Sequence, residues 1–542
     1  MEKNIQCLSD LHVLIIDDSK TSSMLIRQQL VSLGYQFDQV MTAASYQEAV
    51  KAVEIRHYDI LIMDYHLEQS ITGYELITLL LNKRLIDKST GVLIVSGDSR
   101  QETVLTSLSG RVKHFIMKPI KTVDLKNKLQ ILQHETSALY QIQELIKLNP
   151  TGLSDTLTEY SKELNFAISF ESSLIEILVE LEMWDTLNSL IISSLSSSHP
   201  SKECAKAMLL ARNGHTLMAI KALSDYLVQN PLSLKAMDYL SSLYEMEHNK
   251  EEALYWALKA FEFTPSVSER AIRAATLAAD LNKRSVVIRV GYTFANHISI
   301  VDSRWLQSII KFGHSLEAVY IRAEEPSSKK ELLQHFNNFL QMTEKRLPKV
   351  RKPHLVSYRS VFQCRLLFHE NKLEGSHKKI LQSISSYYDN LSTCPIALTC
   401  EILPILELFG ELWLHDYLSK LFASQLKRYE LTSSDLLKQA PFDVKHLKEL
   451  YDVLPNGGSR ETDEETIAIY EMIINLFPYS TEAKIRYLHA VASGAKEPTH
   501  NPILLLTTLS DLALPPNWNQ WLTDLRNANT SIEPPAPFSV AL

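Results

Sequence analysis

Residues 60–64 read Ile-Leu-Ile-Met-Asp, four consecutive apolar residues that end at a carboxylate. Residues 13–18, Val-Leu-Ile-Ile-Asp-Asp, repeat this pattern nearer the N-terminus. Apolar runs of this length are typical of strands that are buried on both faces, as in parallel sheets. The same criterion predicts three further strands, at residues 39–43, 92–95 and 115–117.

Helical periodicity occupies the intervals around these strands, at residues 20–33, 46–56, 73–81, 99–108 and 123–133. Strands that alternate with helical crossovers form a parallel sheet with helices on both faces. We therefore predict an α/β doubly wound domain, flavodoxin-like with a five-stranded parallel sheet, over residues 1–133. In such sheets ligands bind beyond the carboxyl ends of the strands.

Several of the predicted strands end at residues with ionisable or polar side chains. Three carboxylates, one hydroxyl and one amine stand there: Asp17, Asp18, Asp64, Ser96 and Lys118. Carboxylates that converge repel one another unless a divalent cation neutralises them, and hard carboxylate oxygens suit Mg²⁺. The hydroxyl and the amine would then hold the oxygens of a phosphoryl group.

This constellation resembles the receiver domain of two-component response regulators, and it covers about a quarter of the chain. The resemblance implies that Asp64 accepts a phosphoryl group from a sensor histidine kinase or a phosphotransfer protein. It also implies a magnesium ion held by Asp18, by the side chain of Asp64 and by the backbone carbonyl of His66. Asp17 would act on this ion mainly through bound water.

The same resemblance gives roles to three more residues. Lys118 would pair with the phosphate, and Ser96 would hydrogen-bond it and move on activation. Phe115 would be the aromatic switch residue that turns inward when Ser96 moves. One departure is that the family often has a Met-Pro turn after the phosphoacceptor and a glycine eight residues on. Here no proline follows and Gly73 lies nine residues after Asp64, so we expect altered partner choice or phosphate lifetime.

Two other interpretations of this domain stay open. One is a degenerate receiver that serves only as a docking fold. The other is a nucleotide-binding doubly wound domain, which the absence of a glycine-rich phosphate loop after the first strand argues against.

The rest of the chain has a different composition. Five of the 14 glycines lie in the first 125 residues, and all that follows contains the other nine. Tight turns and strands use glycine, so we predict a mostly α-helical region. Pro231 and Pro265 are 34 residues apart, as are Ala219 and Ala253, and this is the period of tetratricopeptide repeats. The region is therefore predicted to be a tetratricopeptide-like solenoid, with an irregular α-bundle as the alternative.

These patterns predict five segments. They are a receiver at 1–133, a helical connector at 134–150, a helical repeat domain at 151–345 with its clearest repeats at 200–299, a second helical region at 346–530 and a frayed tail at 531–542. The connector continues the last receiver helix. It either packs into the next domain or pairs two subunits of a homodimer as a coiled coil.

The amino-acid composition limits the classes of partner that the chain is expected to bind. The chain carries 55 Lys and Arg against 63 Asp and Glu, a net charge of −8, which argues against broad nucleic-acid binding. A basic cluster at residues 345–352 is interpreted as a solvated connection, with a nucleic-acid patch as the alternative. The sequence has no apolar run of eighteen residues and no signal peptide, so we expect a cytoplasmic protein without a membrane partner.

Outside the receiver no enzyme motif occurs, so we expect a regulatory phosphoacceptor that assists its own magnesium-dependent phosphorylation and dephosphorylation. The architecture resembles VieB-type regulators, and the output would be protein binding that modulates a sensor kinase or a companion response regulator. One alternative is an aspartyl-phosphate phosphatase that acts on another receiver. A nucleic-acid-binding regulator is the other.

Overall fold

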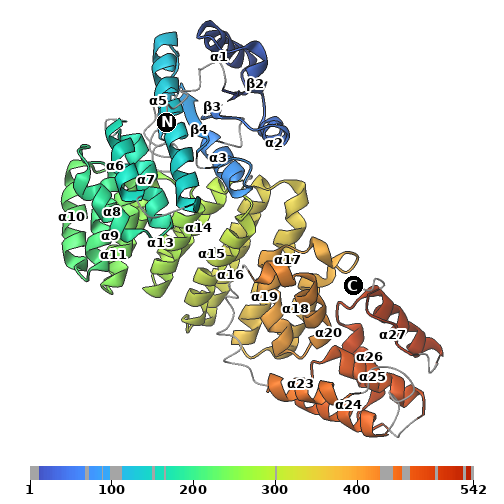
Figure 1. Cartoon of the computed structure of the whole chain (residues 1–542). Coiled ribbons are helices and arrows are strands. Elements are labelled where there is room, and N and C mark those ends of the chain that lie inside the picture. Colours follow the sequence, from blue (N-terminus) through green and yellow to red (C-terminus); the bar gives the residue numbers. More distant parts are fainter. Residues whose placement is uncertain are drawn as a thin grey trace. The chain divides into compact units, whose positions relative to one another are not determined.

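The structure is a computed structural model of the chain. It describes residues 11–67, 72–87, 89–97, 113–148, 153–163, 167–299, 302–427, 443–454, 464–494, 498–528 and 533–538. The chain divides into two compact units, Met1–Ser308 and Ile309–Leu542. The first unit contains the sheet and a series of helices, and the described residues of the second unit form helices and no sheet (Figure 1).

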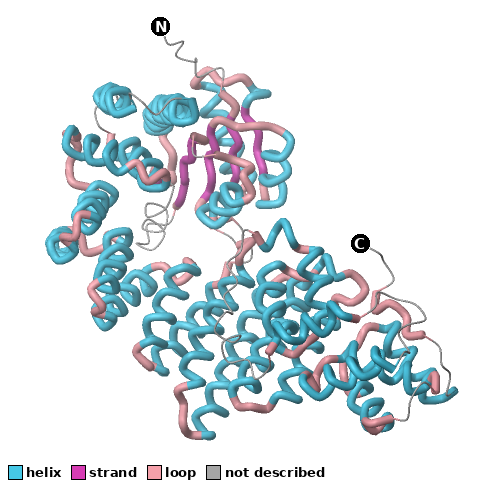
Figure 2. Tube along the Cα trace, turned by 60° about the horizontal axis from the view of Figure 1, so that its bottom comes forward, coloured by secondary structure: helices cyan, strands magenta, loops and turns pink. Residues whose placement is uncertain are grey.

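The strands form one parallel sheet in the order β2-β1-β3-β4-β5, drawn in magenta in Figure 2. They are β1 Val13–Ile16, β2 Val40–Ala43, β3 Ile60–Asp64, β4 Gly91–Ser96 and β5 His114–Met117. Val13 of β1 lies beside Val40 of β2 on one side and Ile60 of β3 on the other. Because every pairing is parallel, all five carboxyl ends meet at one edge. The predicted five-stranded doubly wound fold is confirmed.

Helices cover both faces of this sheet. They are α1 Lys20–Ser32, α2 Tyr46–Ile55, α3 Gly73–Asn82 and α5 Thr122–Leu148, with a short 3-10 turn, η2 Phe37–Gln39, before β2. Ile26 of α1 and Leu129 of α5 lie in the apolar cluster on one face, and Val53 of α2 and Ile77 of α3 lie in the cluster on the other. The helix predicted at residues 99–108 lies outside the described residues.

Helix α5 belongs to two hydrophobic cores. Its 27 residues run without interruption, and Leu125 and Leu129 near its start pack under the sheet. Leu139 and Ile142, further along, are buried with α6 and α7 in a separate core. The connector therefore packs into the helical region, as the first of its two interpretations predicts, and these seam residues are covered within the chain.

The helices that follow in the first unit keep a fixed interval. They are α6 Leu153–Glu163, α7 Ile168–Glu180, α8 Trp184–Ser193, α9 Pro200–Arg212, α10 Thr216–Gln229, α11 Leu234–Met246, α12 Lys250–Phe263, α13 Ser268–Asp280 and α14 Arg284–His297. Helices α9, α11 and α13 begin at residues 200, 234 and 268, and α10, α12 and α14 begin at 216, 250 and 284. Each step is 34 residues, and Figure 1 shows the helices as successive hairpins.

Small residues and special turns recur with the same interval. Ser241 of α11 is fully buried, and its hydroxyl donates to the carbonyl of Ala253 in α12 over 2.8 Å, so the paired helices approach closely there. The turns inside the three pairs each contain a residue with left-handed φ, namely Gly214 (81°), His248 (58°) and Asn282 (54°). The sequence pattern predicted the recurring alanines. It did not predict that this turn position has a left-handed φ. The identification with tetratricopeptide repeats stays a prediction.

The second unit is built from further helices. They are α15 Trp305–Ile321, which begins in the first unit, α16 Pro326–Arg346, η3 Lys349–Arg351, α17 Lys352–His369, α18 Leu373–Ser385, η4 Leu391–Thr393, α19 Ile396–Leu408, α20 Leu412–Leu421, α21 Ala423–Leu426, α23 Val444–Val453, α24 Glu464–Leu476, α25 Thr481–Ala492, α26 Pro502–Ser510 and α27 Pro516–Ala528. A buried ion network links three of them: the Arg365 guanidinium bonds Glu317 at 2.7 Å and Glu401 at 3.3 Å.

Two predicted segments lie in this unit. The basic cluster is the turn between α16 and α17, where Lys345, Arg346 and Lys349 are exposed. The tail is not frayed over residues 533–538, because the Trp518 indole N–H donates to the carbonyl of Pro535 over 2.9 Å. The proline-rich composition had suggested fraying, but it did not show this contact. The finer domain boundaries stay predictions.

None of the described helices is both long enough and apolar enough to span a membrane.

Candidate functional site

Three carboxylates meet at the carboxyl end of the sheet. Asp17 and Asp18 follow β1, Asp64 ends the adjacent strand β3, and oxygens of all three lie within 4.8 Å of one another. Asp17 is 1% exposed and the Asp64 side chain is 12% exposed, whereas Asp18 is open to solvent. The site thus has one buried acid, one exposed acid and an accessible acid between these extremes.

Lys118 connects two of these acids. Its Nζ lies 2.9 Å from Oδ2 of Asp17 and 3.0 Å from Oδ2 of Asp64. The lysine directly follows β5, and its backbone N–H donates to the carbonyl of Ser96 at the end of β4 over 2.9 Å. Backbone and side chain together fix the ammonium between the carboxylates.

Asp17 has two further donors, which fix the orientation of its carboxylate. The backbone N–H of Ser19 donates to Oδ1 over 2.9 Å, and the hydroxyl of Ser22 donates to Oδ2 over 2.6 Å. Ser22 was not predicted from the sequence. Its only signal is a hydroxyl in the first turn of the helix after β1, and Ser19, which caps that helix, gives a similar signal.

The electrostatic surroundings shift two pKa values. Burial raises the pKa of Asp64; hydrogen bonding and attraction from Lys118 oppose this, while the charges of Asp17 and Asp18 add to it. Burial alone would lower the pKa of Lys118, but its hydrogen bonds to Asp17 and Asp64 outweigh burial and raise it. The ammonium therefore stays charged, and the carboxylate that it contacts is a stronger base than an ordinary aspartate.

The loop after Asp64 returns close to its own start. A Cβ on Gly73 would lie 2.5 Å from the backbone oxygen of Asp64, so only glycine fits there. The Gly73 N–H donates to the carbonyl of Tyr65 over 2.7 Å, and Thr72 caps α3. The glycine noted from the sequence thus retains a close-packing role although it lies nine residues after Asp64. Residues 68–71 lie outside the described residues.

The other predicted site residues are placed as follows. Ser96 ends β4 and is fully buried. Phe115 in β5 is half-buried against the cluster that α2 and α3 share. His66 is exposed, and its ring meets Tyr65 edge-on with centroids 5.0 Å apart. Their roles in switching and in metal binding stay predictions.

The donor set fits a hard divalent cation. Asp17, Asp18 and Asp64 supply only oxygen atoms, and among the described residues the ammonium of Lys118 contacts two of these three carboxylates, Asp17 and Asp64. An oxygen-only site with uncompensated negative charge suits Mg²⁺ better than metals that prefer nitrogen or sulfur ligands. Asp18 is the most exposed of the three carboxylates.

Comparison with known proteins gives matches to response regulators, in agreement with the carboxylate cluster. Residues 13–130 match the family described as "Response regulator receiver domain". A two-component response regulator of Arabidopsis thaliana, ARR14, is 28% identical over 134 residues, which are 25% of this chain and 33% of that protein. The rice regulator ORR12 is 28% identical over 127 residues, 23% of this chain and 100% of its own length. The chemotaxis protein CheY1 of Helicobacter pylori is 26% identical over 121 residues, 22% of this chain and 94% of its own.

Among solved structures, the receiver domain protein (CheY-like) of Methanospirillum hungatei is 26% identical. The match covers 23% of this chain and 96% of that one, with a TM-score of 0.21. The signal receiver domain of a histidine kinase from Syntrophus aciditrophicus is 27% identical, with coverages of 23% and 89% and a TM-score of 0.20. This chain spans only a third of the length of ARR14. Receiver domains typically bind Mg²⁺, in keeping with the carboxylate cluster.

Proposed function

Because residues 13–130 are a response regulator receiver domain, we propose that the protein is a two-component response regulator that is phosphorylated on Asp64. The observation that carries the proposal is the pairing of Lys118 with both Asp17 and Asp64 at the carboxyl end of the sheet. A sensor histidine kinase or a phosphotransfer protein is the expected donor.

In the proposed reaction, a carboxylate oxygen of Asp64 attacks the phosphorus of the donor. An O–P bond to Asp64 forms, and the N–P bond of the donor phosphohistidine breaks. Lys118, already 3.0 Å from Asp64, would keep its proton and move its hydrogen bond to a phosphoryl oxygen. A magnesium ion held by Asp18, Asp64 and the His66 carbonyl, with Asp17 acting through water, would neutralise charge on the transferring group.

The added phosphoryl group brings a charge of about −1.5 to −2 into the site. Ser96 would turn its hydroxyl toward this charge, and Phe115 would move into the space that Ser96 leaves. Support for this step is that both residues lie on the neighbouring strands β4 and β5 and that Phe115 is only half-buried.

Phosphotransfer to the purified chain tests the proposal. The wild type, with a small-molecule phosphodonor and Mg²⁺, is expected to gain one phosphoryl group by intact mass, and Asp64→Ala is expected to gain none. Asp38→Asn, which changes an exposed aspartate of the same domain, is the control and should behave as the wild type. Equal labelling of Asp64→Ala and wild type would refute the proposal.

The helical region is proposed to provide the output through protein binding, without turnover of a substrate of its own. Support comes from the regular 34-residue interval of α9 to α14, since stacked helix pairs form extended binding surfaces. The expected partner is the sensor kinase or a companion response regulator, whose phosphotransfer the bound protein would modulate.

A reconstituted phosphotransfer assay checks this output. Added protein should change partner phosphorylation only at about one-to-one stoichiometry, as expected for binding. Complete loss of partner phosphate at substoichiometric protein would show that the helical region is a phosphatase instead.

A further inference from the structure

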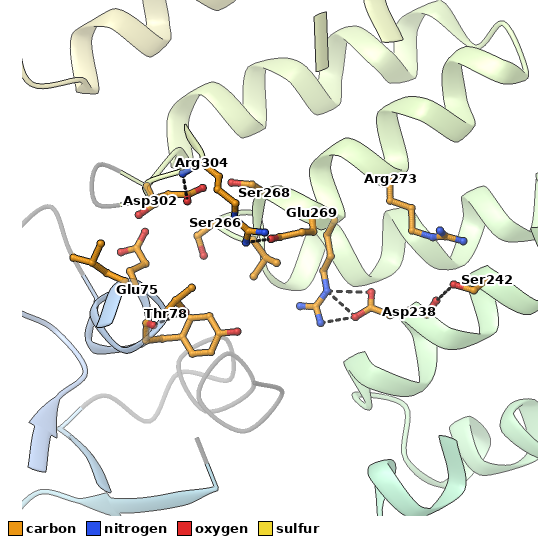
Figure 3. A pocket seen from close by; sticks show the side chains of 15 residues that line it. Glu75, Thr78, Asp238, Ser242, Ser266, Ser268, Glu269, Arg273, Asp302 and Arg304 are labelled. Carbon is orange, nitrogen blue, oxygen red and sulfur yellow. Dashed lines mark hydrogen bonds and ion pairs between the residues drawn. The ribbon is translucent and has the colours of Figure 1, made fainter. Parts of the chain in front are cut away.

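A cavity lies in the first unit, and none of the site aspartates lines it. Its volume is about 420 Å³, and its wall comes from α3 of the receiver, from α11 and α13, and from the loop before α15. Figure 3 shows Glu75 and Thr78 of α3 across from Ser266 and Ser268, with Arg304 beside the serines. The volume lies within the range of pockets that hold small ligands.

One residue of this wall has unused hydrogen-bonding capacity. Ser299 is 6% exposed, and within the described part of the chain its Oγ has no hydrogen-bond partner. A buried hydroxyl without a partner destabilises the fold. A ligand atom that accepts its proton would remove that penalty, so the hydroxyl indicates an acceptor in the pocket.

The N-terminus of α13 lies in the same wall. Its cap position is Val267, whose side chain makes no cap hydrogen bond. The backbone N–H groups of Ser268 and Glu269 consequently have no acceptor in the part of the chain that the structure describes. Free N–H groups at a helix N-terminus, together with the helix dipole, attract an anion.

The charges around these donors restrict which anion fits. Three arginines and four carboxylates line the pocket: Arg270, Arg273, Arg304, Glu75, Asp238, Glu269 and Asp302. The arginines are already bonded to carboxylates, such as Arg270 to Asp238 and Arg304 to Glu269, each at 2.7 Å. The net negative charge of these side chains repels a dianion such as phosphate more strongly than a singly charged carboxylate, which can accept from the three neutral donors.

We propose that this pocket binds a carboxylate group through Ser299 Oγ and the N–H groups of Ser268 and Glu269. The apolar side chains of Leu79 and Val267 would cover the carbon chain of the ligand. A small carboxylic acid and the C-terminus of a peptide present the same group. This site does not depend on phosphorylation of Asp64.

Calorimetric titration of the full chain tests the proposal. The probes are acetate, succinate, a tripeptide with a free C-terminal carboxylate, the same tripeptide amidated, and inorganic phosphate. The variant is Ser299→Ala, and the matched control is Ser173→Ala, whose hydroxyl is bonded within α7. We expect Ser299→Ala to bind carboxylates about tenfold more weakly or worse. Its melting temperature should not fall, because the removed hydroxyl has no bond to lose.

The probes distinguish a small acid from a peptide C-terminus as the source of the carboxylate group. Binding of acetate or succinate assigns the site to small acids, and binding of the free but not the amidated tripeptide assigns it to a chain end. The proposal is overturned if no carboxylate binds saturably up to about 10 mM. It is also overturned if Ser299→Ala binds as the wild type does, or if phosphate binds more tightly than every carboxylate.

Discussion

Asp17 is tightly constrained, because its carboxylate accepts from Ser19, Ser22 and Lys118. A carboxylate held by three donors cannot rotate to follow an ion, so it fixes the position of whatever binds between it and Asp64. Removing a residue that orients a metal-binding group typically lowers metal affinity by about 10- to 100-fold. Ser22 is such a residue in the proposed magnesium site.

Ser22→Ala is expected to lower the affinity for Mg²⁺ by roughly tenfold. The affinity can be measured as the Mg²⁺ concentration that gives half-maximal phosphorylation with a small-molecule donor. Ser32→Ala, whose hydroxyl bonds a carbonyl at the other end of α1, should leave this concentration unchanged. An unchanged requirement in Ser22→Ala would show that the orientation of Asp17 does not matter.

The raised pKa of Asp64 predicts how the metal-free site titrates. Burial, with the nearby Asp17 and Asp18, raises the pKa, so the carboxylate takes up its proton at a higher pH than an ordinary aspartate does. An NMR titration of the side-chain carboxyl carbons without Mg²⁺ should show this higher midpoint for Asp64. Lys118→Met removes the opposing charge and should move the midpoint to still higher pH. A shift in the other direction would contradict the assignment.

The same shift has a consequence for stability. A group with a raised pKa in the fold favours folding when protonated, so this contribution grows as pH falls through the folded pKa and is absent above it. Asp64→Asn mimics the neutral form and is expected to stabilise the receiver by about 1 kcal/mol near neutral pH. Thermal unfolding of the wild type and Asp64→Asn at neutral pH measures this stabilisation. A lower melting temperature of the variant would contradict the argument.

At the scale of the elements, the turns of the helix pairs depend on backbone conformation more than on contacts. Gly214 has φ of 81°, and a Cβ there would meet nothing within 4 Å. Gly214→Ala should therefore destabilise the first unit by about 1 kcal/mol through backbone strain alone. Gly375→Ala lies inside α18, where a Cβ makes ordinary contact, and should stabilise by about 0.5–1 kcal/mol. Equal melting shifts of the two variants would refute this.

Helices and strands could be predicted from the sequence where a single hydrophobic periodicity distinguished one from the other. The apolar runs before Asp17 and Asp64 specified buried parallel strands, and parallel strands bring their carboxyl ends to one edge, so the acids could be placed together. Ser22 and Ser299 could not be found in this way. Their importance depends on which atoms other elements bring to the hydroxyl, or fail to bring, and serines occur throughout the helices. The left-handed turn position was hidden because glycine, histidine and asparagine occupy it in turn.

At the scale of the first unit, the receiver and the helices share a partly buried ion cluster. Lys113 before β5 bonds Glu176 of α7 at 2.7 Å, and Lys235 of α11 bonds the same oxygen at 3.0 Å. Removing the shared acid removes one charged contact from each of the two ammonium groups, whereas removing one lysine leaves the other pair intact. Glu176→Gln is therefore expected to destabilise the unit by about 1–2 kcal/mol, more than Lys113→Met. Chemical unfolding of both variants checks the order.

The continuity of helix α5 limits how the receiver domain of this protein could be replaced by another. Because one uninterrupted helix is buried under the sheet at Leu129 and among the helices at Ile142, its two faces are held in phase. One extra residue between them would turn the second face by about 100° away from its core. A foreign receiver could replace this one as a cassette only if the graft preserved helical phase. A stable graft is thus expected only at junctions that add or remove close to whole helical turns.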